Sequence, residues 1–177
     1  MKASIMISGM GGQGVVSIGL LLAECAAKTS SAACLPEHGP EQRGGYSRCT
    51  ITISDAEIIS PSPKKYTYII AMDEPSYKKF AGQMEVGGLM FLNADLIPPG
   101  PADGQKLFIP AESIAAELRN PRAANIVLLG ALIGASGLLP KELIMEEIRE
   151  KFGGKPAALA ANLAAFEKGL EMACKQA

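Results

Sequence analysis

The chain has 177 residues, of which 48% are hydrophobic and 20% charged, and its net charge is −1. This length and composition suit one globular domain and exclude a disordered chain. A near-zero charge, the lack of a basic block and only 5% aromatic residues disfavour partners that are recognised through nucleic-acid phosphates or stacked bases.

Predicted strands and helices alternate through the first two thirds of the chain. Residues 3–8 form an apolar run that ends at Gly9, as a buried parallel strand would, and residues 13–28 have the length and apolar stripe of a helix. The later strands are predicted at residues 30–35, 47–54, 66–72, 88–92 and 106–109. Strict alternation over 47–54 favours a half-exposed strand. A helix begins near Asp73, and the others are predicted at 111–118, 122–136, 140–152 and 156–174.

This order predicts an α/β fold, namely a doubly wound, mostly parallel sheet with helices on both faces and a helical C-terminal third. We find no domain boundary, so residues 1–177 are interpreted as a single domain. Residues 123–139 carry no charge but include Asn125 and several glycines, which favours a helix packed inside a soluble protein over one in lipid. Four scattered cysteines and no visible secretory signal predict reduced thiols, a cytoplasmic location, no membrane and no metal cluster.

A glycine turn follows the first predicted strand. The run Gly9-Met-Gly-Gly-Gln-Gly14 fits G-x-G-x-x-G between a strand and a helix. Backbone amides at such a helix start attract phosphate or carboxylate, so the anion-binding candidates here are Gly9, Gly11, Gly12, Gln13 and Gly14. A purely structural tight turn is the alternative. A complete dinucleotide site is disfavoured, because the nearest acid, Glu37, follows a proline and adjoins an arginine-rich segment.

That segment is the most distinctive part of the sequence: His38-Gly-Pro-Glu-Gln-Arg-Gly-Gly-Tyr-Ser-Arg48. Its glycines and proline predict a loop, and its arginines could face an anion or a carboxylate. The binding candidates are Arg43, Gly44, Gly45 and Arg48, and the interface or structural candidates are Gly39, Pro40, Glu41 and Asn125. Alternatively, Glu41 pairs with one of the arginines in an ordered surface loop. His38 has no nucleophile beside it, so no catalytic residue is predicted.

Taken together, these runs resemble the gamma subunit of 2-oxoacid:ferredoxin oxidoreductases, as do Ala71-Met-Asp-Glu-Pro-Ser76 and Ala123-Ala-Asn-Ile-Val-Leu-Leu-Gly130. The family commonly has Tyr at the position of His38, which is therefore given no role. The resemblance implies a Rossmann-like, non-catalytic subunit of an enzyme that converts a 2-oxoacid and coenzyme A to acyl-CoA, carbon dioxide and reduced ferredoxin. The oxoacid stays open among pyruvate, 2-oxoglutarate and branched-chain acids such as ketoisovalerate, with a weak preference for the last two.

The resemblance also implies the cofactors and partners. Thiamine diphosphate, magnesium and [4Fe-4S] clusters are expected in alpha, beta and ferredoxin-like delta subunits, and ferredoxin is the electron acceptor. This chain would hold no cofactor alone but would contribute to the coenzyme A region. The alternatives are a stand-alone NAD(P)-dependent oxidoreductase and a regulatory nucleotide-binding module.

Overall fold

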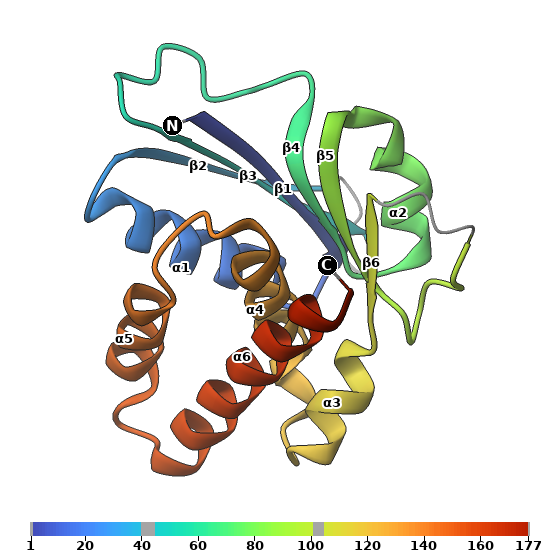
Figure 1. Ribbon diagram of the computed structural model, residues 1–177, viewed down its shortest axis with the longest axis vertical. Helices are drawn as coiled ribbons and strands as arrows, with labels where there is room; N and C mark the ends of the chain where they lie inside the picture. Colours follow the sequence, from blue (N-terminus) through green and yellow to red (C-terminus); the bar gives the residue numbers. More distant parts are fainter. Residues whose placement is uncertain (1, 40–44, 101–104, 177) are drawn as a thin grey trace.

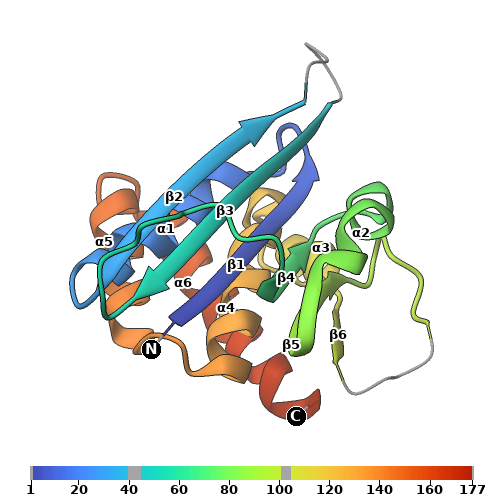
Figure 2. The same cartoon turned by 90° about the horizontal axis from the view of Figure 1, so that it is seen from above.

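The computed structural model describes residues 2–39, 45–100 and 105–176. A six-stranded sheet in the order β2-β3-β1-β4-β5-β6 runs through the molecule (Figures 1 and 2). The strands are β1 (Lys2–Met10), β2 (Ser31–His38), β3 (Tyr46–Ser54), β4 (Tyr66–Ala71), β5 (Met84–Asn93) and β6 (Lys106–Ile109). The pairs β1–β4, β4–β5 and β5–β6 are parallel, whereas β3 is antiparallel to both of its neighbours. The predicted α/β class with a mostly parallel sheet is confirmed.

Helices cover the two faces of this sheet unequally. The six α-helices are α1 (Val15–Ala27), α2 (Glu74–Phe80), α3 (Ala111–Glu117), α4 (Ala124–Ser136), α5 (Lys141–Phe152) and α6 (Pro156–Gln176), with short 3₁₀ turns η1 (Ala81–Gln83) and η2 (Pro121–Ala123). Figure 1 shows α1, α4, α5 and α6 on one side of the sheet and α2 on the other. The larger hydrophobic core lies under α1 and α4, and a smaller one lies under α2. The helical C-terminal third is confirmed.

Helix α4 occupies the centre of the larger core, and its glycines allow close contact with α6. All residues from Ala124 to Ile133 are buried. A Cβ atom added to Gly130 would overlap the carbonyl oxygen of Phe166, and one added to Gly169 would overlap that of Val127. The uncharged segment is therefore a buried helix against which α6 packs backbone to backbone. No helix in the described part of the chain combines the length and apolarity needed to cross a membrane.

Two local predictions around β3 are wrong. The expected loop over 38–48 is shorter, because β2 extends through His38 and β3 already begins at Tyr46. Cross-strand pairing in register, including Glu37 opposite Arg48, overrides the local glycine signal. Both strand ends, and Arg48 with them, therefore belong to the sheet.

Strand β3 is also not half-exposed, because Cys49–Ile53 are buried without interruption. The apolar side chains of β3 join the core that contains α1. The threonines on the opposite face are covered in part by the connection from β3 to β4, which Figure 2 shows crossing the sheet. Thr50 hydrogen-bonds the Tyr66 hydroxyl at 3.3 Å, and the Thr52 hydroxyl donates to the Pro61 carbonyl at 3.3 Å. Alternation in the sequence shows that one face of the strand is polar, but it does not show whether that face is exposed. Here another segment of the chain covers the polar face and buries it.

Candidate functional site

The glycine turn lies where β1 ends and α1 begins. Gly12 and Gly14 have φ values of 98° and 77°, a left-handed conformation that favours glycine. The turn is stabilised by Gln13, whose side-chain oxygen accepts a hydrogen bond from the Met10 amide at 2.7 Å. Because Gly14 is the N-cap of α1 and has no side chain, the amides of the first helical turn receive no capping bond from it. The helix start therefore keeps its partial positive charge without a side-chain cap from this residue.

Asn125, at the start of α4, packs directly over this turn. Its side-chain amide donates to the Gly14 carbonyl at 3.2 Å, and its oxygen accepts from the Ile126 amide at 2.9 Å. A Cβ atom at position 14 would overlap the Asn125 amide nitrogen. Asn125 therefore acts as an internal hydrogen-bond anchor between α4 and the glycine turn.

The glycine turn and the β2–β3 connection, which are well separated in sequence, are brought together. The Gly11 amide donates to the Gly45 carbonyl at 3.1 Å, and the Gly39 amide donates to the Tyr46 carbonyl at 2.8 Å. Gly39 and Gly45, the described ends of the connection, are therefore hydrogen-bonded to β3 and to the glycine turn. The remaining candidates on it, Pro40, Glu41, Arg43 and Gly44, lie outside the described residues.

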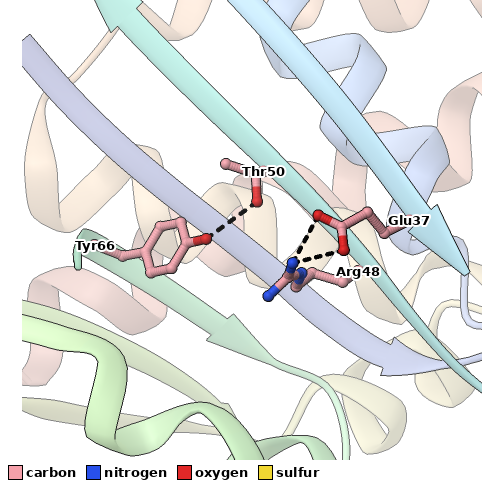
Figure 3. Close-up of polar contacts among 4 residues, drawn as sticks. All are labelled: Glu37, Arg48, Thr50 and Tyr66. Atoms are coloured by element: carbon pink, nitrogen blue, oxygen red, sulfur yellow. Dashed lines mark hydrogen bonds and ion pairs between the residues drawn. The ribbon is translucent and has the colours of Figure 1, made fainter. Parts of the chain in front are cut away.

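Arg48 points across the sheet to Glu37 on β2. Figure 3 shows its guanidinium reaching both carboxylate oxygens, each 2.6 Å from Nη2. The ring of Phe80 lies 5.4 Å from the guanidinium carbon, a distance typical of a cation–π contact. Burial alone would lower the pKa of Arg48, but the hydrogen bond and charge of Glu37 outweigh it and the pKa is raised. Within the described residues, the buried Nε atom of Arg48 has no hydrogen-bond partner.

The ion pair between Arg48 and Glu37 affects two interpretations made from the sequence, the anion-facing arginines and the dinucleotide site. Arg48 pairs with Glu37, so one of the two arginines is already neutralised inside the fold. Glu37 is the acid that a dinucleotide site would need for ribose, and both its oxygens accept from Arg48. The arrangement therefore disfavours that site. The neighbouring His38 shares a 3.4 Å hydrogen bond between its Nδ1 atom and the Ser47 hydroxyl.

A cavity of about 440 Å³ opens beside the glycine turn, on the side of α4 and α6. It is lined by the turn itself, by the segment that leads into α4, and by the end of α5 with the start of α6. Three of its lining residues are cationic and exposed: Arg122, Lys151 and Lys155. Sequence reasoning missed all three. For the two lysines a sequence signal was present. In the run Lys151-Phe-Gly-Gly-Lys155, two lysines flank a glycine pair between two predicted helices.

Comparison with known proteins gives one consistent result. A family model described as pyruvate ferredoxin/flavodoxin oxidoreductase matches residues 4–172. The ketoisovalerate oxidoreductase subunit VorA of Methanothermobacter thermautotrophicus is 35% identical over 175 residues, or 97% of this chain. The match takes in 36% of VorA, so the chain spans about a third of that relative's length.

Two solved structures resemble the whole chain. A gamma subunit of a keto/oxoacid ferredoxin oxidoreductase from Geobacter sulfurreducens superposes with a TM-score of 0.82 and 27% identity, over 98% of this chain and 99% of that one. The 2-oxoglutarate:ferredoxin oxidoreductase of Magnetococcus marinus, solved with 2-oxoglutarate, coenzyme A and succinyl-CoA bound, gives a TM-score of 0.87 and 26% identity. That match covers 98% of this chain and 31% of the other.

Proposed function

Because this chain belongs to the pyruvate ferredoxin/flavodoxin oxidoreductase family, we propose that it is the gamma subunit of a multi-subunit 2-oxoacid:ferredoxin oxidoreductase. The complex would convert a 2-oxoacid and coenzyme A to acyl-CoA and carbon dioxide and pass the electrons to ferredoxin. The observation that carries the proposal is the near-complete overlap with the Geobacter gamma subunit, over 98% of this chain and 99% of that one.

In this proposal the chain supplies binding surface and no catalytic group. Alpha, beta and ferredoxin-like delta subunits would hold the thiamine diphosphate, magnesium and [4Fe-4S] clusters. We propose 2-oxoglutarate or a branched-chain acid as the substrate, in keeping with the substrates named for the Magnetococcus enzyme and for VorA. A cytoplasmic location and a single domain over 1–177 belong to the same proposal.

The glycine turn and the β2–β3 connection would together face coenzyme A phosphates or the partner subunits. The turn suits an anion, because a Cβ atom at Gly12 would meet nothing within 4 Å and the first amides of α1 point out of the helix end. Gly45 brings the connection to this turn through its bond with Gly11. Since Arg48 is already paired with Glu37, Arg43 is the arginine that we assign to the ligand or the partner.

The assembly is tested by isolating the tagged chain from its native cells without oxygen and identifying the bound proteins by mass spectrometry. We expect alpha and beta subunits in fixed ratio, and ferredoxin reduction that requires both a 2-oxoacid and coenzyme A. A chain that purifies alone and enhances NADH fluorescence on titration would overturn the proposal in favour of an NAD(P)-dependent oxidoreductase. Equivalent binding of adenine nucleotides without partners would favour a regulatory module.

The role of the connection is tested separately in the assembled complex. Arg43→Ala should raise the KM for coenzyme A more than the KM for the oxoacid, because a charge-assisted contact to phosphate is lost. Gel filtration of the variant complex establishes that the subunits still associate. An unchanged coenzyme A KM with intact assembly would remove the ligand role and leave the interface role.

A further inference from the structure

Two cysteines on neighbouring strands bring their sulfur atoms close together. Cys34 on β2 and Cys49 on β3 are both free thiols, and their Sγ atoms lie 3.2 Å apart. We propose that this pair is an oxidation site: a hydroperoxide converts it to a reversible disulfide, with Cys34 reacting first and Cys49 second. The inference concerns residues of this chain alone and does not require the proposed function.

The strand register places the two thiols on one face of the sheet. Cys34 is opposite Ile51 and Cys49 is opposite Pro36, so the two cysteines are diagonal neighbours across the antiparallel pair. Both side chains belong to the core that contains α1. The sulfur atoms need to approach by only about 1.2 Å to reach the length of an S–S bond, about 2.0 Å.

The diagonal register also makes the bond reversible. Diagonal neighbours have Cα atoms about 7–8 Å apart, slightly more than the 4.4–6.8 Å, approximately, that is usual for a disulfide. Closing the bond therefore has to draw β2 and β3 together locally. A disulfide formed in this way is easily reduced, as is typical of regulatory rather than structural disulfides.

Helix α1 holds the Cys49 sulfur in place. A Cβ atom added to Gly19 would overlap that sulfur, so the bare backbone of α1 is what leaves room for it. Cys49 is fully buried, and its thiol shares a hydrogen bond with that of Cys34. Burial, together with this hydrogen bond, raises the pKa of the Cys49 thiol above its ordinary value of 9.0. Cys49 therefore stays protonated and shielded from solvent, which suits the thiol that reacts second.

Cys34 is the thiol that an oxidant can reach. It is partly exposed, because β2 is an edge strand of the sheet and pairs with β3 alone. The other two cysteines are directed elsewhere, since the Cys25 thiol donates to the Leu143 carbonyl at 3.5 Å and Cys174 is exposed near the end of α6. Among the described residues, no three His, Cys, Asp or Glu side chains are grouped so that they could hold a metal ion. A pair of thiols without further ligands suits a disulfide better than a zinc or iron–sulfur site.

The reaction balances with one hydroperoxide and two thiols. The Cys34 sulfur attacks the terminal oxygen of the peroxide, the O–O bond breaks, and the leaving oxygen takes up the Cys34 proton, so that Cys34 becomes a sulfenic acid. The Cys49 sulfur then attacks the sulfur of this acid. An S–S bond forms, and the hydroxide that leaves takes the Cys49 proton and departs as water. Two electrons thus pass from the thiols to the peroxide, and a thiol reductant returns them.

The test is peptide mapping of the full chain after treatment with hydrogen peroxide and blocking of the remaining thiols. Trypsin cleaves after Arg43 and Arg48, so Cys34 and Cys49 fall on separate peptides that a disulfide would link. We expect two of the four thiols to be lost, the linked Cys34–Cys49 peptides to appear, and dithiothreitol to restore both thiols. The same treatment in urea is the comparison, because an unfolded chain has no strand register to select this pair.

Variants separate the roles of the two thiols. In Cys49→Ala, oxidation of Cys34 should stop at the sulfenic acid, which dimedone traps. In Cys34→Ser, the buried Cys49 should react with peroxide about tenfold or more slowly than Cys34 does in Cys49→Ala. Cys174→Ala is the matched control, since it removes an exposed thiol outside the pair and should leave the Cys34–Cys49 link and its rate of formation unchanged.

Three results would overturn the proposal. The first is that the folded chain gives the same mixture of cysteine pairs as the chain in urea. The second is that peroxide leaves both thiols free, or takes Cys34 to a sulfinic or sulfonic acid without a link to Cys49. The third is that the link joins two chains, which non-reducing gel electrophoresis would show as a dimer. Because the measurements use the chain alone, none of these results depends on which complex the chain joins.

Discussion

The side-chain amide of Asn125 donates a hydrogen bond to the carbonyl oxygen of Gly14 at 3.2 Å, across 111 residues of sequence. This bond joins the first turn of α4 to the glycine turn, and both residues line the cavity that contains Arg122, Lys151 and Lys155. Asn125 is itself buried, and its second polar atom is used by the Ile126 amide. The glycine turn is therefore held in part by a contact between the first and the last thirds of the chain.

Gly14→Ala should destabilise the fold by about 2–4 kcal/mol, because the new methyl group meets Asn125 and the residue must keep a left-handed φ. Gly12→Ala should cost about 1–2 kcal/mol, since it shares the left-handed φ but has open space around its Cβ position. Urea unfolding measures both. Gly82→Ala, where space is open and φ is not left-handed, serves as the control and should be nearly neutral. Equal losses for Gly14 and Gly12 would show that the Asn125 contact contributes nothing.

Glu37→Ala should destabilise the fold by about 1–2 kcal/mol, because it leaves the half-buried guanidinium of Arg48 without its counter-charge. The double variant Glu37→Ala/Arg48→Met should recover part of this loss, since an apolar side chain of similar length can still pack on Phe80. Free energies of unfolding of the two single variants and the double variant form the measurement. If the double variant is less stable than Glu37→Ala, the cation–π contact with Phe80 outweighs the orphaned charge.

Gly169→Ala should cost about 3 kcal/mol, because the added methyl group overlaps the Val127 carbonyl and forces α6 away from α4. Thermal unfolding would report this as a clear fall in Tm. Gly154→Ala is the matched control, since its Cβ position is open. An unchanged Tm for Gly169→Ala would mean that α4 and α6 do not pack this closely.

The buried thiol of Cys25 predicts a loss of stability at alkaline pH. Burial, with a smaller contribution from Glu147, raises the pKa of Cys25 from its ordinary value of 9.0 to about 12. The unfolded chain loses this proton near pH 9 while the folded chain keeps it, so the stabilisation is complete below pH 9 and declines as pH rises toward 12.

Between pH 8.5 and 10, the free energy of unfolding should therefore fall by about 1 kcal/mol more in the unmodified chain than in Cys25→Ala. Urea titrations at these two pH values measure the difference. Cys174→Ala, at an exposed position, should keep the unmodified slope. Equal slopes for Cys25→Ala and the unmodified chain would contradict a raised thiol pKa.

Much of the fold could be predicted because its signals are local. The apolar run before Gly9, the stripe of α6 and the glycines of α4 each indicate their element within one window of sequence. The strand at β3 was predicted, but its half-exposure was wrong because its burial depends on the segment that crosses its polar face. The site was only partly predictable for a similar reason. The glycine turn has a spacing that can be recognised, whereas Arg122 and Lys155 gain meaning only as neighbours in space.

By itself, the sequence determined the α/β class, the position of the glycine turn and the resemblance to gamma subunits, because residue spacing and backbone chemistry act over short stretches of chain. Only the tertiary structure decided that Arg48 is neutralised by Glu37, that Asn125 bonds to Gly14, and that Arg122 lines one cavity with Lys151 and Lys155. Strand register and helix packing set these relationships, and both arise from contacts between residues far apart in the chain.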